Sequence, residues 1–102
     1  MGLNNDTRRT KAGKLHTLAR QLRTVGDDSR LGILCVLIAR RSACVSEIAE
    51  AAGLSVAAAS FHLQVLAKEK VLVPARRGKR IYYALSKENF VADLKRHICK
   101  YK

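Results

Sequence analysis

The sequence predicts a mainly α-helical fold, a winged helix-turn-helix with five helices and a two-stranded β-hairpin wing. Two segments with helical spacing, 46–52 and 55–68, lie so close together that only a sharp turn fits between them. Gly53 supplies the positive φ that such a turn needs, and Ser55 is a good N-cap for the second helix. Two strand-like segments then flank a basic run, the expected hairpin tip, Arg76-Arg77-Gly78-Lys79-Arg80.

Two further helices are expected before this motif. Residues 1–13 are polar and basic without an apolar period, so they predict a disordered arm before a single domain over residues 14–102. A helical stripe follows and ends at Gly26; it consists of Leu15, Leu18, Leu22 and Val25. Asp27 or Asp28 is expected to cap the next helix, whose expected buried face holds Leu31, Leu34, Cys35 and Ile38.

The hairpin and a fifth helix are expected to complete the domain. Its strands are expected over residues 71–76 and 80–85, with Pro74 placing the first strand at a sheet edge. The residues expected to face inward are Ile81, Tyr83 and Leu85. Ser86 is expected to cap the last helix, whose apolar stripe is Phe90, Leu94, Ile98 and Tyr101. This stripe needs a partner, so the sequence predicts a homodimer joined by the first and last helices.

The charge distribution favours a polyanionic partner. The formal net charge is +12 and the pI is near 10.3, yet residues 42–67 contain no Lys or Arg. The positive charge lies in the amino-terminal third, the hairpin and the last helix. We therefore expect the second helix of the motif to read bases through small groups while the flanking segments bind phosphates.

Other protein classes fit the sequence less well. The basic residues do not lie on one long amphipathic helix, which argues against membrane binding. The absence of a signal peptide and of a long apolar run predicts a soluble, cytoplasmic protein, in which three cysteines are not expected to form structural disulfides. An enzyme is not expected, because no nucleophile has a base and an orienting group in a recognisable context.

Three stretches, in this order and at this spacing, carry a family resemblance. Residues 26–34 resemble an Asp-Pro-Thr-Arg-Leu-x-Ile-Leu signature in which Asp28 replaces the proline. Residues 55–63 resemble a Ser-x-x-x-Val-Ser-x-His-Leu recognition helix, and the basic run followed by Tyr83 and Leu85 resembles a wing. From about residue 15 to residue 99 the chain thus resembles the ArsR/SmtB family of dimeric transcriptional repressors. This resemblance implies a repressor that occupies a palindromic double-stranded DNA operator until an inducer arrives.

The resemblance also implies which residues bind DNA. On the recognition helix they are Val56, Ala57, Ser60, Phe61, His62 and Gln64, and in the wing they are Arg76, Arg77, Lys79 and Arg80. Small apolar groups at the base-facing positions leave contact with thymine methyl groups as the means of reading, although the alanines fit simple helix propensity equally well. His62 is expected to contact a phosphate or to pack beneath the turn.

Two cysteines suggest how the inducer acts. Cys35 in the second helix and Cys99 near the end of the last helix resemble the persulfide- and oxidant-sensing branch of the family. Two thiols suit this role because one forms the persulfide or sulfenate and the other resolves it. We therefore expect Cys35 and Cys99 to form a thiol switch, with buried hydrophobic packing as the alternative role.

Cys44 raises the possibility of a different signal. Residues 44–48 resemble the arsenic-sensing Cys-Val-Cys-Asp-Leu box, but Ser46 replaces the second thiol and a hydroxyl is a poor arsenite ligand. Asp93 and His97 occupy positions where a zinc-sensing branch has ligands, although an ordinary pair on one helix face explains them, so no metal is expected. A constitutive DNA-binding protein and a protein-interaction module also fit the sequence. No cofactor is required, and reactive sulfur species or arsenite would fit as the inducer.

Overall fold

A computed structural model describes residues 13–101. Five helices and three strands follow one another as α2 (Gly13–Val25), α3 (Asp28–Arg40), β1 (Ser42–Cys44), α4 (Val45–Ala52), α5 (Val56–Lys68), β2 (Leu72–Arg77), β3 (Arg80–Leu85) and α6 (Asn89–Cys99). Residues 1–12 of the expected arm lie outside the described part of the chain. α2 begins at Gly13, the last residue of the expected arm.

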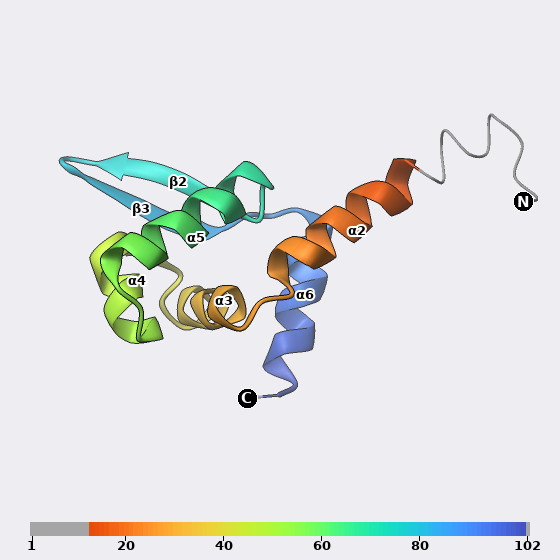
Figure 1. Cartoon of the computed structure of the whole chain (residues 1–102), viewed down its shortest axis with the longest axis horizontal. Coiled ribbons are helices and arrows are strands. Elements are labelled where there is room, and N and C mark those ends of the chain that lie inside the picture. The colour runs from red at the N-terminus through yellow and green to blue at the C-terminus, as the bar shows by residue number, and fades with distance from the viewer. Residues whose placement is uncertain (1–12, 102) are drawn as a thin grey trace, which may run out of the picture.

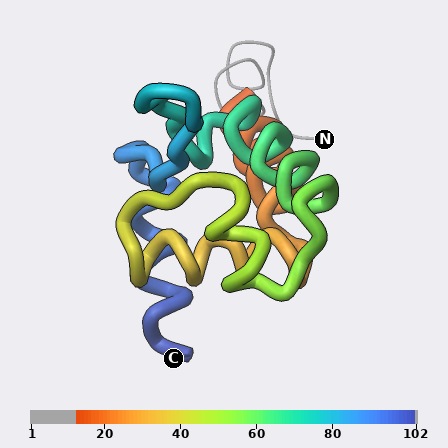
Figure 2. Tube along the Cα trace, turned by 90° about the vertical axis from the view of Figure 1, so that its left-hand side faces the viewer, coloured from red at the N-terminus to blue at the C-terminus, as the bar shows by residue number. Residues whose placement is uncertain are grey.

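The helices surround a core of aliphatic side chains. α3 contributes Ile33, Leu34 and Leu37, all nearly inaccessible to solvent, and helices α4 and α5 contribute Ile48, Leu63 and Leu66. Figure 1 shows the hairpin projecting at one end of the molecule, while α2 and α6 lie at the other end. Turned by 90°, Figure 2 shows α5 running beside α2, an arrangement in agreement with their direct contacts. α5 thus contacts the hairpin strand β2 and the terminal helix α2.

The sheet has three antiparallel strands in the order β1-β3-β2. The expected two-stranded hairpin is present, but β1 pairs with the other side of β3, with Ala43 opposite Tyr83. Pro74 lies on the edge strand β2, as predicted, since proline lacks the N–H that an inner strand needs on both sides of the ladder. Tyr83 is buried as expected, whereas Ile81 is 38% exposed, because this half of the hairpin extends beyond the core.

The helix-turn-helix follows the predicted local chemistry. Gly53 has φ 70° in the turn after α4, the left-handed conformation that glycine adopts without strain. The Ser55 hydroxyl accepts the backbone N–H of Ala58 at 3.1 Å and so caps α5. Asp27 caps α3 in the same way by accepting the N–H of Arg30 at 3.0 Å. These caps explain why both helices begin where they do.

Two helix predictions differ from the structure. α6 begins at Asn89 with Glu88 as its N-cap residue, so Ser86 does not cap it; the Ser86 N–H instead bonds to the Val71 carbonyl at 2.9 Å and stays with the sheet. In α3, the expected residues Leu31, Cys35 and Ile38 are only half-buried, and the fully buried face lies at Ile33, Leu34 and Leu37. α3 is covered by the core on one side and faces α6 on another.

The terminal helices leave apolar side chains on the surface. On α2, Leu15, Leu18 and Leu22 are 62%, 40% and 51% exposed, and Tyr101 after α6 is also exposed. In residues 13–101 no single helix has the length and apolarity of a membrane span. Taken together, α4 and α5 have the length and composition of a span, but the chain bends by 109° between them.

Candidate nucleic-acid interface and sensor sites

One face of α5 is turned to solvent and carries no charge until its last residue. The residues of this face recur at helical spacing: Val56, Ala57, Ser60, Phe61, Gln64 and Lys68. Val56 and Phe61 are 57% and 59% exposed, which is unusual for side chains of this size. The Gln64 amide donates to the Ser60 hydroxyl at 3.4 Å. Five of the six recognition-helix residues expected to bind DNA therefore share one surface, which we call the reading face: Val56, Ala57, Ser60, Phe61 and Gln64.

The sixth residue, His62, faces another way. Its Nδ1 accepts a hydrogen bond from Nε of Arg30 at 3.0 Å, and its ring meets that of Phe61 edge to face at 5.5 Å between centroids. The ring is half-buried between α5 and α3. Sequence reasoning did not connect it with Arg30, because no local pattern relates two residues that are 32 positions apart.

The wing presents four exposed cations at its tip. The turn is closed by Gly78, whose φ is 63°, and the expected wing residues flank it: Arg76, Arg77, Lys79 and Arg80. The guanidinium of Arg77 lies 4.8 Å from the centroid of the Tyr82 ring, a cation–π contact that holds the arginine along the hairpin. Within the described residues, no ion pair involves these four cations. They are consequently available to an anionic partner.

Cys44 lies where the wing meets the helix-turn-helix. It is 3% exposed, and its Sγ lies 3.4 Å from Oγ of Ser46 and accepts from Arg80 at 3.8 Å. Hydrogen bonds from the Ser46 side chain and the Glu47 backbone lower the pKa of the thiol, against the opposing effect of burial. Because the Glu47 carboxylate accepts the Cys44 N–H at 3.0 Å, the pKa of that carboxyl is lowered as well. A cleft of about 370 Å³ opens here, lined by Cys44, Val45, Ser46, Val56, Lys79, Arg80 and Ile81.

The other two cysteines lie near the terminal helices. Cys35 lines an apolar hollow of about 460 Å³ between α2, α3 and α6, together with Leu22, Leu94, Ile98 and others. Cys99 is exposed and is not part of that lining. It follows Ile98 by one position, so it is turned by about 100° around the helix. The structure therefore places Cys35 against α6, but it does not bring Cys99 into the hollow with it.

The weak alternative of a metal site at Cys44, Asp93 and His97 finds no ligand cluster in the described residues. In residues 13–101, no group of three or more His, Cys, Asp or Glu side chains is arranged to hold a metal ion. Asp93 instead pairs with Arg96 one turn away, and the His97 ring meets the Tyr101 ring edge to face at 5.4 Å. Both residues have neighbours on their own helix.

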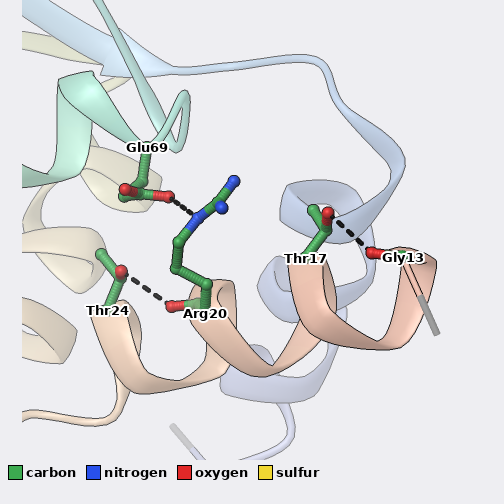
Figure 3. A network of polar contacts seen from close by, with 5 residues as sticks. All are labelled: Gly13, Thr17, Arg20, Thr24 and Glu69. Atoms are coloured by element: carbon green, nitrogen blue, oxygen red, sulfur yellow. Dashed lines mark hydrogen bonds and ion pairs between the residues drawn. The ribbon is translucent and has the colours of Figure 1, made fainter.

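Two ties that sequence reasoning missed join α2 to the recognition helix. Arg20 on α2 donates from Nε to the Glu69 carboxylate at 2.9 Å, and Glu69 is the C-cap residue of α5 (Figure 3). Arg30 donates both to His62 and to the Thr24 carbonyl at 3.1 Å in the last turn of α2. Arg30 belongs to a motif that the sequence already singled out, but its partners became known only from the fold.

Comparison with known proteins gives a consistent assignment. Residues 27–70 match the family model described as bacterial regulatory protein, arsR family. The chain is 34% identical over 74 residues to a transcriptional repressor SmtB homolog of Synechocystis sp., and 32% identical over 72 residues to a cadmium resistance transcriptional regulatory protein CadC homolog of Staphylococcus aureus. These alignments cover 72% and 71% of this chain but 54% and 60% of the two relatives, so the chain spans little more than half of their length.

A solved structure resembles this fold over almost the whole chain. The homodimeric winged helix-turn-helix DNA-binding domain of Mb0332 from Mycobacterium bovis is 30% identical, with a TM-score of 0.79 that covers 99% of this chain and 89% of that one. The relatives are regulators rather than enzymes, in agreement with the sequence-based expectation. By its motifs, its fold and these similarities, the chain belongs to the ArsR family of winged helix-turn-helix regulators.

Proposed function

We propose that this protein is a cytoplasmic, homodimeric transcriptional repressor that binds a two-fold double-stranded DNA operator. The observation that carries the proposal is the pairing of an uncharged, solvent-facing side of α5 with four exposed cations on the adjacent hairpin. Phosphate contacts give affinity and register, while contacts to base edges give specificity. The hairpin therefore supplies the phosphate contacts and α5 supplies the base contacts, on one surface of the protein.

The division of labour follows from the residues. The wing cations Arg76, Arg77, Lys79 and Arg80 bind phosphates, and the reading face enters the major groove. Val56, Ala57 and Phe61 offer methyl, methylene and ring carbons, which suit the C5-methyl group of thymine. Gln64 is the side chain in this face that suits adenine, through its amide. The operator half-site is accordingly rich in A·T pairs at the contacted positions.

Selection of binding sites from random duplexes tests the proposal. The expected result is an inverted repeat whose half-site centres lie about one helical turn apart, bound with an affinity that falls steeply as salt rises. Replacing contacted thymines by deoxyuridine removes a methyl group and leaves every hydrogen-bonding group in place. We expect this replacement to weaken binding by about fourfold for each contacted thymine, since burial of one methyl group is worth about 0.8 kcal/mol.

The control for this prediction is the Val56→Ala variant. It removes two methyl groups from the reading face, so the difference in affinity between the thymine and deoxyuridine operators should be smaller than for the wild-type protein. If deoxyuridine has no effect on the wild-type protein, the reading face does not read methyl groups. If no sequence is enriched at all, the repressor proposal itself is wrong.

For the inducing signal, we infer a thiol switch that uses Cys35 and Cys99. The support is that Cys35 lines the hollow against α6, the helix whose last turn carries Cys99. A bridge between the two sulfurs requires the end of α6 to turn inward, because Cys99 is exposed in the reduced protein. Since α6 is expected to join the dimer, this change alters the spacing of the two recognition helices.

Polysulfide treatment tests this switch. The two thiols lose two electrons and two protons as a Cys–Sn–Cys bridge forms, and the polysulfide is reduced to sulfide. We expect Cys35→Ser and Cys99→Ser to bind the operator normally but to remain bound after polysulfide is added. Cys44→Ser is the matched control and should release the operator as wild type does. Release of the Cys35 and Cys99 variants at the wild-type rate would exclude the switch, and mass spectrometry locates the bridge.

Cys44 supports a second candidate, response to arsenite or another soft metal. Its lowered pKa raises the thiolate fraction, and thiolate is the form that binds soft metals. Its contact with Arg80 connects the thiol directly with the wing. Within residues 13–101 no cluster of ligands surrounds it, and all three cysteines of the chain lie in this range, so further thiols would have to come from a partner subunit. Loss of arsenite-induced release in Cys44→Ser alone would favour this candidate over the thiol switch.

A further inference from the structure

The Arg30 side chain connects three helices. Its Nε donates to Nδ1 of His62 on α5 at 3.0 Å, and one terminal nitrogen donates to the Thr24 carbonyl of α2 at 3.1 Å. Its own backbone N–H donates to the Asp27 carboxylate at 3.0 Å, which fixes the start of α3. Both side-chain contacts are partly buried, where hydrogen bonds to a charged group contribute more than at the surface.

The chemistry of the two side chains fixes the state of the imidazole. A guanidinium has five N–H donors and no acceptor, so Nδ1 of His62 must present its lone pair to Arg30. The N–H of the imidazole is then on Nε2 in this contact. Hydrogen bonding to Arg30 therefore holds one tautomer and one ring orientation.

α2 holds the recognition helix at a second point. The Arg20–Glu69 ion pair reaches the C-cap of α5, seven positions after His62 and about two helical turns along the axis (Figure 3). Within α2 the Thr24 hydroxyl bonds to the Arg20 carbonyl at 2.9 Å, so the two attachment points belong to adjacent turns. Two attachments at different heights restrict the tilt of α5 against α2, which a single contact cannot do.

We propose that His62 is a positioning residue, which transmits the pose of α2 to the reading face through Arg30. This inference rests on the proposed operator binding. The same α2 presents Leu15, Leu18 and Leu22 to solvent, the side expected to meet the second subunit. The neighbouring Phe61, against the His62 ring, belongs to the reading face. The path from dimer seam to bases thus runs from α2 through Arg30 and His62 to Phe61.

A set of His62 variants separates positioning from simple packing. His62→Leu keeps an apolar side chain of moderate size but has no acceptor for Arg30, whereas His62→Asn restores an acceptor close to the position of Nδ1. We expect His62→Leu to bind the selected operator about tenfold more weakly, the factor expected for the loss of one hydrogen bond to a charged group. His62→Asn should recover most of this loss. Thermal unfolding of each variant shows whether it is folded at the temperature of the assay.

Affinity for a random duplex of equal length provides the discriminating readout. A positioning residue changes operator affinity and leaves non-specific affinity unchanged, because wing phosphates dominate the latter. If His62 bound a phosphate itself, both affinities and the salt slope would fall together, and the proposal would be overturned. It would also be overturned if His62→Asn were as weak as His62→Leu while both were folded.

A double-mutant cycle with Arg30→Met tests the path itself. If His62 acts through Arg30, the double variant should bind the operator as weakly as either single variant, since each removes the same contact. Additive losses would mean that the two residues act separately, which contradicts the proposal. Operator binding and the role of His62 are tested separately. If the wild-type protein selects no operator, the repressor function is refuted. If the wild-type protein selects an operator and the His62 variants bind it equally well, only the role of His62 is refuted.

Discussion

Leu22→Asp is expected to convert the dimer into monomers and to abolish operator binding at concentrations that saturate the wild type. Leu22 is 51% exposed on α2 and lines the apolar hollow beside α6. An unpaired carboxylate placed in an apolar seam costs several kcal/mol, and a two-fold interface contains it twice. Since about 1.4 kcal/mol is a factor of ten, the dimer constant should fall by more than about a thousandfold. Sedimentation velocity measures the change.

Two variants complete this experiment. Leu18→Asp lies on the same stripe of α2 and should have a similar effect, because Leu18 is also exposed. His16→Asp makes the same change of charge on another side of the helix and should leave the protein dimeric. If all three variants sediment as dimers, a surface other than the terminal helices joins the subunits. Leu94→Asp is less informative, because Leu94 also packs against the core and its change would affect folding.

The double variant Arg77→Ala with Lys79→Ala should weaken binding to every DNA sequence by roughly tenfold or more at low salt. Both side chains are exposed at the hairpin tip and lie beyond the core, so their loss leaves the fold intact. Each phosphate contact releases about one counterion, and the slope of log affinity against log salt should therefore become shallower by up to about two. Fluorescence anisotropy at several salt concentrations measures both quantities.

A charge-matched control shows whether the position of the wing cations or the total charge of the protein determines DNA affinity. Lys87→Ala with Lys95→Ala removes two exposed cations from the segment that contains α6. It should change the slope much less, because long-range attraction is screened within about 10 Å at 0.1 M salt. Equal effects of the two double variants would mean that net charge alone drives binding. An unchanged affinity of the wing variant at all salt concentrations would remove the wing from the interface.

Local chemistry was sufficient to predict most of the helices and the hairpin. The aliphatic spacing of α2, the Ser55 cap, the left-handed Gly53 and the basic tip around Gly78 each depend on residues within a few positions of one another. Such features are legible in a sequence because helix periods, caps and turns are short-range. Of these, Ser55 belongs to a stretch that carried the family resemblance, and the family model matches residues 27–70.

The elements that the sequence did not predict depend on distant parts of the chain. β1 has three residues, too few for an alternating pattern, and it is a strand because β3 pairs with it about 40 positions later. α6 begins at Asn89, because Ser86 bonds instead to Val71, the residue just before β2. Likewise, α3 could be recognised as a helix, but only packing against its neighbours decided which of its apolar residues are buried.

The candidate site shows the same division. The sequence by itself determined that uncharged residues recur at helical spacing along α5 and that four cations flank one turn of the wing, because both patterns are short-range. Only the tertiary structure decided that His62 faces Arg30 from 32 positions away, that Arg80 lies over Cys44, and that Cys99 is turned out of the hollow beside Cys35. Side-chain partners across elements are set by how helices and strands pack against one another, and no local pattern of residues encodes that packing.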